Sequence, residues 1–215
     1  MQFQDRRSGR ILLRELSDYR YGLRDIRPKP GQVSAFLDIG ANAGMLSIHA
    51  RLQLPQARVC SVDPDPNTYA CLCHNTENMG IELLQAGLGV SGTKLNIARG
   101  HKTSVARRYV AAEAGIPAYT LPELLSHFKL DPATTWLKCD CEGGEWTMVG
   151  DSGAEDALAQ MPCLGFEVHI ADATKNIQTF KTWLDTILGK THNKVQDIGR
   201  RKLGNIVYVR KDILI

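Results

Sequence analysis

The sequence has no apolar run long enough to cross a bilayer, no internal repeat and no low-complexity tract. It also has no linker-like stretch, so 215 residues with 43% hydrophobic content indicate one domain with a sizeable core. We place this domain at residues 31–215, after an N-terminal helical and basic extension over residues 1–30. Residues 1–10 are polar and charged where a signal peptide has an apolar core, which predicts a cytoplasmic protein with no membrane partner.

Several catalytic signatures are missing as well. The chain contains no Walker sequence, and no serine lies in the glycine-flanked elbow of a hydrolase. The net charge of +3, with a pI near 8.5, is too mild to require a nucleic-acid partner. These absences disfavour nucleotide hydrolysis and serine-based hydrolysis.

Basic residues nevertheless gather in three places. They are Arg6, Arg7, Arg10, Arg14, Arg20, Arg24 and Arg27, then Arg107 and Arg108, then Arg200, Arg201 and Lys202. Such runs are often solvated faces. The functional alternative is an anionic acceptor, namely a phosphorylated, nucleotide-linked or acidic sugar, or RNA.

The six cysteines suit a reducing compartment. Cys60, Cys139 and Cys163 fall in predicted buried strands, where a free cysteine behaves as a small hydrophobe. Cys71 and Cys73 precede His74 and look like metal ligands, but on a helix they are about 200° apart. We therefore do not expect them to bind one metal.

The stretch FLDIGANAG at residues 36–44 is the most informative motif. An apolar strand ends near Asp38 and turns into a helix through Gly40, Ala41, Asn42 and Gly44, where glycines let the backbone approach a ligand. The spacing is Gly-x-Asn-x-Gly and not the Gly-x-Gly-x-x-Gly that cradles a pyrophosphate, which disfavours NAD and FAD. The turn predicts a pocket for S-adenosylmethionine, unless it only opens an α/β unit.

A second apolar run, Ala57–Val62, ends in Asp63, Pro64 and Asp65. An acid about 20 residues beyond a glycine turn is placed to accept hydrogen bonds from ribose hydroxyls. We assign that role to Asp63.

The chain resembles the FkbM family of S-adenosylmethionine-dependent methyltransferases from about Ala35 to Val209. The matching motifs are DIGANAG at 38–44, VDPDPNTY at 62–69, TLPELL at 120–125 and KCDCEGGEW at 138–146. Two departures are visible: Asp63 stands where the family usually has glutamate, and Glu123 lies in a stretch that lacks the usual Asp-Asp. The second departure leaves the role of Glu123 open.

The resemblance implies methyl transfer to a hydroxyl of a sugar, glycan or secondary metabolite. It also implies a doubly wound, Rossmann-like α/β fold with a mostly parallel seven-stranded sheet and an antiparallel C-terminal strand. The predicted cofactor-binding residues are Asp38, Gly40, Ala41, Asn42, Gly44, Asp63, Pro64, Leu88 and Asp140.

Apolar runs alternate with helical patterns in the βαβ manner. Beyond the first two strands, we expect strands at Ile81–Gly87, Lys94–Ala98, Thr135–Asp140 and Cys163–Ile170, and a closing hairpin of Lys194–Arg200 with Asn205–Arg210. We expect helices at Ile11–Tyr21, Gly44–Gln53, Asn67–Met79, Leu121–Phe128 and Thr174–Leu188.

Ligands of open α/β sheets lie beyond the carboxyl ends of the strands. Asp38, Asp63, Asp140 and Glu167 fall at or near such ends, so we expect them to face one crevice. The predicted catalytic residues are Asp140, Glu142, Glu167 and His169.

Each catalytic candidate has an alternative. Asp140 contacts the cofactor or orients the acceptor hydroxyl, and Glu142 is either functional or a helix cap. His169, paired with Glu167, is a candidate base or a histidine that only bonds nearby backbone. Glu145 is expected to cap a helix or pair with Lys138. Whether the carboxylates and His169 hold a divalent metal stays open.

Three functions compete. O-methyl transfer to a small-molecule or glycan acceptor leads, an RNA or cap methyltransferase follows, and the third is a non-catalytic cofactor-binding subunit. The loop 100–108 could line the acceptor side or be a plain surface loop. Because the N-terminal segment is short, we expect a second copy or a partner chain to complete the acceptor pocket.

Overall fold

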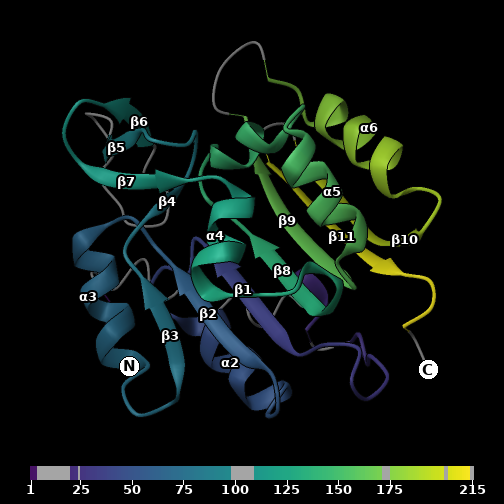
Figure 1. Cartoon of the computed structure of the whole chain (residues 1–215), viewed down its shortest axis with the longest axis horizontal. Coiled ribbons are helices and arrows are strands. Elements are labelled where there is room, and N and C mark those ends of the chain that lie inside the picture. Colours follow the sequence, from purple (N-terminus) through teal and green to yellow (C-terminus); the bar gives the residue numbers. More distant parts are fainter. Residues whose placement is uncertain (4–19, 24, 98–108, 171–174, 201–202, 214–215) are drawn as a thin grey trace.

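The structure is a computed structural model that describes residues 1–3, 20–23, 25–97, 109–170, 175–200 and 203–213 (Figure 1). The predicted N-terminal helix Ile11–Tyr21 falls almost wholly outside these residues, as does the predicted loop 100–108. Within the described residues, no helix has the length and apolar character that a membrane span requires.

A seven-stranded sheet in the order β10-β11-β9-β8-β1-β2-β3 forms the centre of the molecule. Its strands are β1 Ala35–Ile39, β2 Arg58–Val62, β3 Ile81–Leu84, β8 Thr135–Cys139, β9 Cys163–His169, β10 His192–Arg200 and β11 Leu203–Arg210. The first five are mutually parallel, and β11 lies antiparallel between β9 and β10. The predicted doubly wound sheet with an antiparallel C-terminal strand is confirmed.

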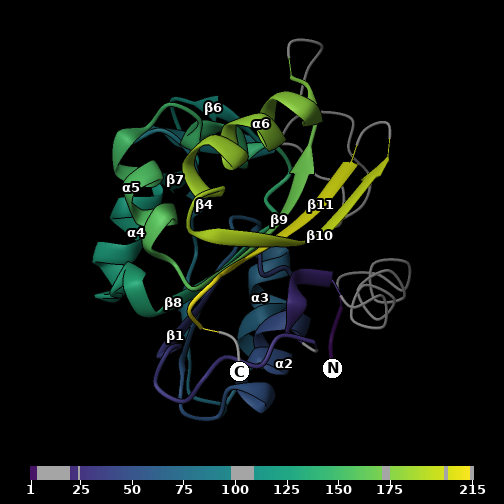
Figure 2. The same cartoon turned by 90° about the vertical axis from the view of Figure 1, so that its right-hand side faces the viewer.

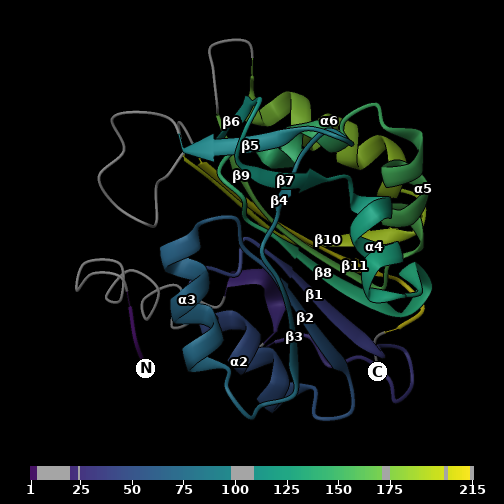
Figure 3. The ribbon, with the colours of Figure 1, turned by 60° about the vertical axis from the view of Figure 1, so that its left-hand side comes forward.

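Helices cover both faces of this sheet (Figures 2 and 3). They are α2 Met45–Gln53, α3 Pro66–Asn75, α4 Leu121–Phe128, α5 Ser152–Gln160 and α6 Ile177–Leu188, with 3₁₀ turns η1 Arg20–Gly22, η2 Pro132–Thr134 and η3 Gly144–Met148. Successive side chains along a strand point to opposite faces of the sheet. Leu37 of β1 joins the core beneath α4, α5 and α6, whereas Phe36 packs with Ala50 of α2. Burial on both faces explains why the central strands read as continuous apolar runs.

A smaller sheet lies beside the main one, in the order β4-β7-β5-β6. Its strands are β4 Gly87–Leu88, β5 Lys94–Ile97, β6 Tyr109–Ala112 and β7 Ile116–Tyr119. The predicted strand Ile81–Gly87 was therefore wrong at its end. Pairing with β2 stops at Leu84, because β2 itself ends at Val62, and the chain then crosses to β7.

One predicted helix differs at its end, and one helix was missed. The helix expected to reach Met79 ends at Asn75, and the φ of 62° at Asn78 prevents a right-handed helix from continuing to Met79. Helix α5 was not predicted, since its residues SGAEDALAQ carry few large apolar side chains. Asp151 caps it by accepting from the Ala154 N–H (3.0 Å).

Candidate active site

The turn after β1 packs directly against the chain that leaves β8. Gly40 has a φ of 76°, and a Cβ there would lie 1.7 Å from the carbonyl oxygen of Asp140. Gly44 has a φ of 85°, and its Cβ would meet Leu72 Cδ1 at 2.7 Å. Only glycine fits both positions, so the sequence motif reflects a tightly packed backbone turn.

Asp63, which follows β2, connects the end of that strand to the glycine turn by hydrogen bonds. Its Oδ2 accepts from the backbone N–H of Asn42 (2.8 Å) and its Oδ1 from that of Asp65 (3.0 Å). Asp65 in turn caps α3 by accepting from the N–H groups of Asn67 and Thr68, each at 2.9 Å. The structure thus brings the predicted ribose acid next to the predicted glycine turn.

Leu88 and Pro64 close one side of the same region. A Cβ on Gly144 would lie 2.7 Å from the Leu88 carbonyl oxygen, and one on Gly87 would lie 3.6 Å from Pro64 Cβ. The predicted cofactor-binding residues therefore gather around the ends of β1, β2, β4 and β8.

Asp38 occupies a different position from the other acids. It is fully buried, lies 2.9 Å from Lys138 Nζ, and accepts from the Ser47 hydroxyl at 2.6 Å. Burial disfavours the charged ammonium, but the Asp38 and Asp140 carboxylates outweigh this effect and raise the pKa of Lys138. Lys138 pairs with Asp38, so of the two alternatives for Glu145 the ion pair with Lys138 is not the one observed.

The chain after β8 makes a strained turn. Glu142 has a φ of 56° and Gly143 a φ of 113°, and a left-handed conformation is costly for a residue with a Cβ. Glu145, fully buried, accepts from the backbone N–H groups of Gly143 (2.9 Å) and His169 (2.5 Å). The expected capping role thus belongs to Glu145, which ties this turn to the end of β9.

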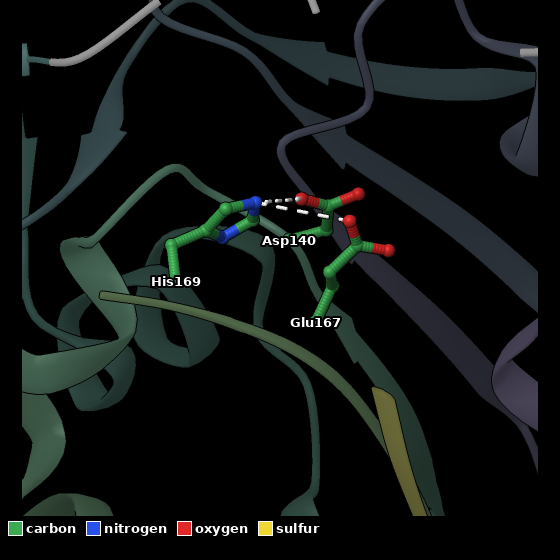
Figure 4. A group of neighbouring side chains, drawn as sticks. All are labelled: Asp140, Glu167 and His169. Carbon is green, nitrogen blue, oxygen red and sulfur yellow. Dashed lines mark ion pairs between the residues drawn. The ribbon is translucent and has the colours of Figure 1, made fainter. Parts of the chain in front are cut away.

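Four carboxylates surround the His169 ring, and Figure 4 shows two of them. Nε2 lies 3.8 Å from Asp140 Oδ1, 3.8 Å from Glu167 Oε1 and 3.6 Å from Glu142 Oε2. Nδ1 lies 3.5 Å from Glu145 Oε1 and makes no hydrogen bond within the described part of the chain. The predicted catalytic residues therefore form one cluster around the His169 ring.

The crowding of these carboxylates around the ring shifts the pKa values of His169 and Glu142. Burial alone would lower the pKa of His169, but contact with Glu145 and the charges of Asp140 and Glu142 outweigh burial and raise it to about 10. Burial, followed by the charges of Asp140, Glu145 and Glu167, raises the pKa of Glu142 to about 8 despite the attraction of His169. The surrounding carboxylates thus favour a positive charge at this position.

Tyr21 belongs to the cluster, although the sequence did not identify it. Its hydroxyl lies 2.8 Å from Asp140 Oδ2 and 3.1 Å from Glu167 Oε2, and Lys138 Nζ sits 5.6 Å from the ring centroid. A Cβ on Gly165 of β9 would lie 3.0 Å from Tyr21 Cβ. A glycine inside an apolar strand is a signal of close approach by another backbone, but it does not say which residue approaches.

Asp140, Glu167 and His169 could also hold a metal, because one ligand atom from each lies within 4.8 Å of the others. The other cysteine and histidine candidates do not gather in this way. Cys71 is buried and Cys73 exposed, as expected for residues on different sides of α3.

A parallel sheet closed by an antiparallel strand, with a glycine turn after β1 and an acid after β2, defines the class of Rossmann-like methyltransferases. A family model described as "Methyltransferase FkbM domain" matches residues 38–195, so the chain belongs to the FkbM methyltransferase family. It is an S-adenosylmethionine-dependent methyltransferase.

Solved structures share the fold at low identity. A fibrillarin/Nop5p complex covers 87% of this chain and 78% of its own, with 13% identity and a TM-score of 0.51. The METTL16 methyltransferase domain covers 93% and 66%, with 11% identity and a TM-score of 0.50. The TrmK of M. capricolum, solved with S-adenosylhomocysteine, covers 89% and 66%, with 8% identity and a TM-score of 0.50. No curated protein sequence matches the chain.

Proposed function

We propose that the protein transfers the methyl group of S-adenosylmethionine to a hydroxyl of a sugar, glycan or secondary metabolite. The observation that carries this proposal is the position of the His169 cluster. The backbone of Asp140 touches Gly40 of the turn assigned to the cofactor, so the polar cluster lies beside the place where the sulfonium would sit.

The cofactor would be held on the β1 and β2 side of this junction. The backbone turn 40–44 would receive the nucleoside, and Asp63 would accept from the ribose hydroxyls. Asp38 supports the turn from below, through Lys138, which donates to the Gly40 carbonyl at 2.7 Å. We therefore assign Asp38 an indirect role in cofactor binding.

Chemistry would take place on the β8 and β9 side. The acceptor oxygen attacks the methyl carbon in line with the departing sulfur, so that a C–O bond forms as the C–S bond breaks. The hydroxyl proton must pass to a nearby base. Asp140 and Glu142 keep 20% and 26% of their side chains exposed, against 7% for Glu167, so we assign acceptor contact to these two.

Glu167 and His169 would act indirectly, without contacting the acceptor. His169 faces both Asp140 and Glu167, and Glu167 and His169 are less exposed than Asp140, so their proposed task is to fix the carboxylates that meet the acceptor. A second copy or a partner chain that completes the acceptor pocket remains part of this proposal.

An acceptor screen tests this function. The protein is incubated with methyl-labelled S-adenosylmethionine and panels of hydroxylated sugars, nucleotide-linked sugars, secondary metabolites and RNA, and labelled products are identified by mass spectrometry. We expect label on a hydroxyl oxygen and at least 100-fold slower transfer by Asp140→Asn. Label found only on RNA would refute the small-molecule acceptor.

A further inference from the structure

We propose that Asp140, Glu167 and His169 bind a hard divalent cation, Mg²⁺ or Mn²⁺, between the ends of β8 and β9 (Figure 4). Figure 4 shows the three side chains converging from neighbouring strands, with His169 Nε2 turned toward both carboxylates. This cation site is proposed in addition to the methyl transfer, and it can be tested without knowing the acceptor.

The distances fit a cation better than direct hydrogen bonds. Nε2 lies 3.6–3.8 Å from oxygens of Asp140, Glu142 and Glu167, whereas a charge-assisted hydrogen bond is about 2.7–2.9 Å long. Ligand atoms at about 2.1 Å from one octahedral cation lie about 3.0 Å apart at right angles and about 4.2 Å apart when opposite. The 3.8 Å separations of Nε2 from Asp140 Oδ1 and from Glu167 Oε1 fall between these values, and all three ligand atoms lie within 4.8 Å of one another.

The opposite edge of the imidazole is also arranged for metal binding. A metal-bound histidine usually rests its other ring nitrogen on a carboxylate or carbonyl, which fixes the ring. Here Nδ1 faces Glu145 Oε1 at 3.5 Å, and Glu145 is itself held by the N–H groups of Gly143 and His169. At 3.5 Å this is a contact and not a hydrogen bond, but it places a carboxylate beside Nδ1 while Nε2 faces Asp140 and Glu167.

Tyr21 orients the two carboxylates from the far side. Its hydroxyl lies near Asp140 Oδ2 and Glu167 Oε2, which leaves Asp140 Oδ1 and Glu167 Oε1 as the atoms that face Nε2. A hydroxyl has a single proton and can donate to one carboxylate at a time. Two carboxylates held this close repel each other, and a cation on their inner side would relieve that repulsion. Tyr21 is thus a positioning residue for the site.

The ligand types narrow the kind of ion. Carboxylate oxygens and water are the ligands that Mg²⁺ and Mn²⁺ prefer, no thiolate is present for a softer ion, and the imidazole favours Mn²⁺ over Mg²⁺. A cation held by three protein ligands keeps coordination positions for the acceptor, and its chemical contribution would be to polarise a bound acceptor oxygen.

Direct cation binding is the test. Mn²⁺ is titrated into the full chain with S-adenosylhomocysteine present, and free Mn²⁺ is followed by electron paramagnetic resonance. We expect one saturable site that Mg²⁺ competes for. Glu167→Gln and His169→Gln should abolish it, and Tyr21→Phe should weaken it about tenfold.

Glu123→Gln is the matched control. Glu123 is a carboxylate of the capping box that begins α4, where glutamine serves equally well, so this variant should bind Mn²⁺ like the wild type. Calorimetric titration with S-adenosylhomocysteine establishes that every variant retains a folded cofactor pocket.

Two results would overturn the cation site. One is a wild type that binds S-adenosylhomocysteine but no Mn²⁺ in a saturable way; the other is equal Mn²⁺ binding by the wild type, Glu167→Gln and His169→Gln. Failure to bind S-adenosylhomocysteine would instead count against the cofactor pocket, and the Mn²⁺ titration would still decide the cation site.

Discussion

Lys138 Nζ lies 2.9 Å from Asp38 Oδ1, and the same ammonium donates to the Gly40 carbonyl at 2.7 Å. The pair joins β1 to β8 directly below the glycine turn, with both side chains almost wholly buried. An acid that the sequence places at a ligand-binding strand end thus supports the pocket from inside the core.

Removing one partner of this pair should be more harmful than removing both. Asp38→Asn leaves a buried ammonium without its counter-charge, which costs about 3–5 kcal/mol of unfolding free energy. The double variant Asp38→Leu with Lys138→Met should lose less, because no buried charge remains. Chemical denaturation of the three proteins measures this, and a loss below about 1 kcal/mol for Asp38→Asn would show that the pair is not structural.

Gly40→Ala should destroy the cofactor pocket. The new methyl group would lie 1.7 Å from the Asp140 carbonyl oxygen, so the turn and the β8 end must move apart. Calorimetry should find no binding of S-adenosylhomocysteine.

Gly31→Ala is the control that separates the steric clash expected for Gly40→Ala from the cost of a positive φ. Gly31 has a similar φ of 80°, but nothing lies within 4 Å of its Cβ position. The Gly31→Ala substitution should cost only about 1–2 kcal/mol of unfolding free energy and leave cofactor binding unchanged. Equal affinities for the two glycine variants would mean that the turn tolerates displacement.

His192 should make the protein less stable in mild acid. It is buried, and its Nε2 lies 2.7 Å from the Met161 carbonyl oxygen. Burial, reinforced by the charge of Arg210, lowers the pKa of His192 below its ordinary value of 6.5 in the folded state. The unfolded chain therefore binds more protons, so the contribution of His192 to stability falls as the pH drops below 6.5 toward the folded pKa.

The difference between wild type and His192→Gln isolates this effect. Thermal unfolding is followed between pH 5 and 7.5, and we expect a flatter dependence of Tm on pH in the variant. His74→Gln removes an exposed imidazole instead and should follow the wild-type curve. Parallel curves for wild type and His192→Gln would contradict the assignment.

The sequence predicted the main sheet well for a physical reason. Central parallel strands are buried on both faces, so they read as apolar runs such as Cys163 to Phe166, and turn residues mark their ends. Because acids at those ends converge at one sheet edge, Asp140, Glu142, Glu167 and His169 could be chosen as a group before their geometry was known.

What the sequence could not supply are contacts between distant segments. Tyr21 meets Asp140 and Glu167 across more than a hundred residues, and no local pattern encodes that contact. Asp38 was recognised as important, but its partner Lys138 lies on another strand, and the sequence had offered Glu145 as a possible partner of Lys138 instead. The strands of the second sheet are too short to give a clear period.

The most direct measurement is calorimetric titration of S-adenosylmethionine, S-adenosylhomocysteine and NAD into the wild type and Asp63→Ala. We expect both sulfur ligands to bind, NAD not to bind, and Asp63→Ala to weaken binding about 10- to 100-fold, because a charged hydrogen-bond acceptor is lost. Asp65→Asn keeps a good helix cap and should bind like the wild type. Binding of NAD, or unchanged affinity in Asp63→Ala, would contradict the assigned cofactor pocket.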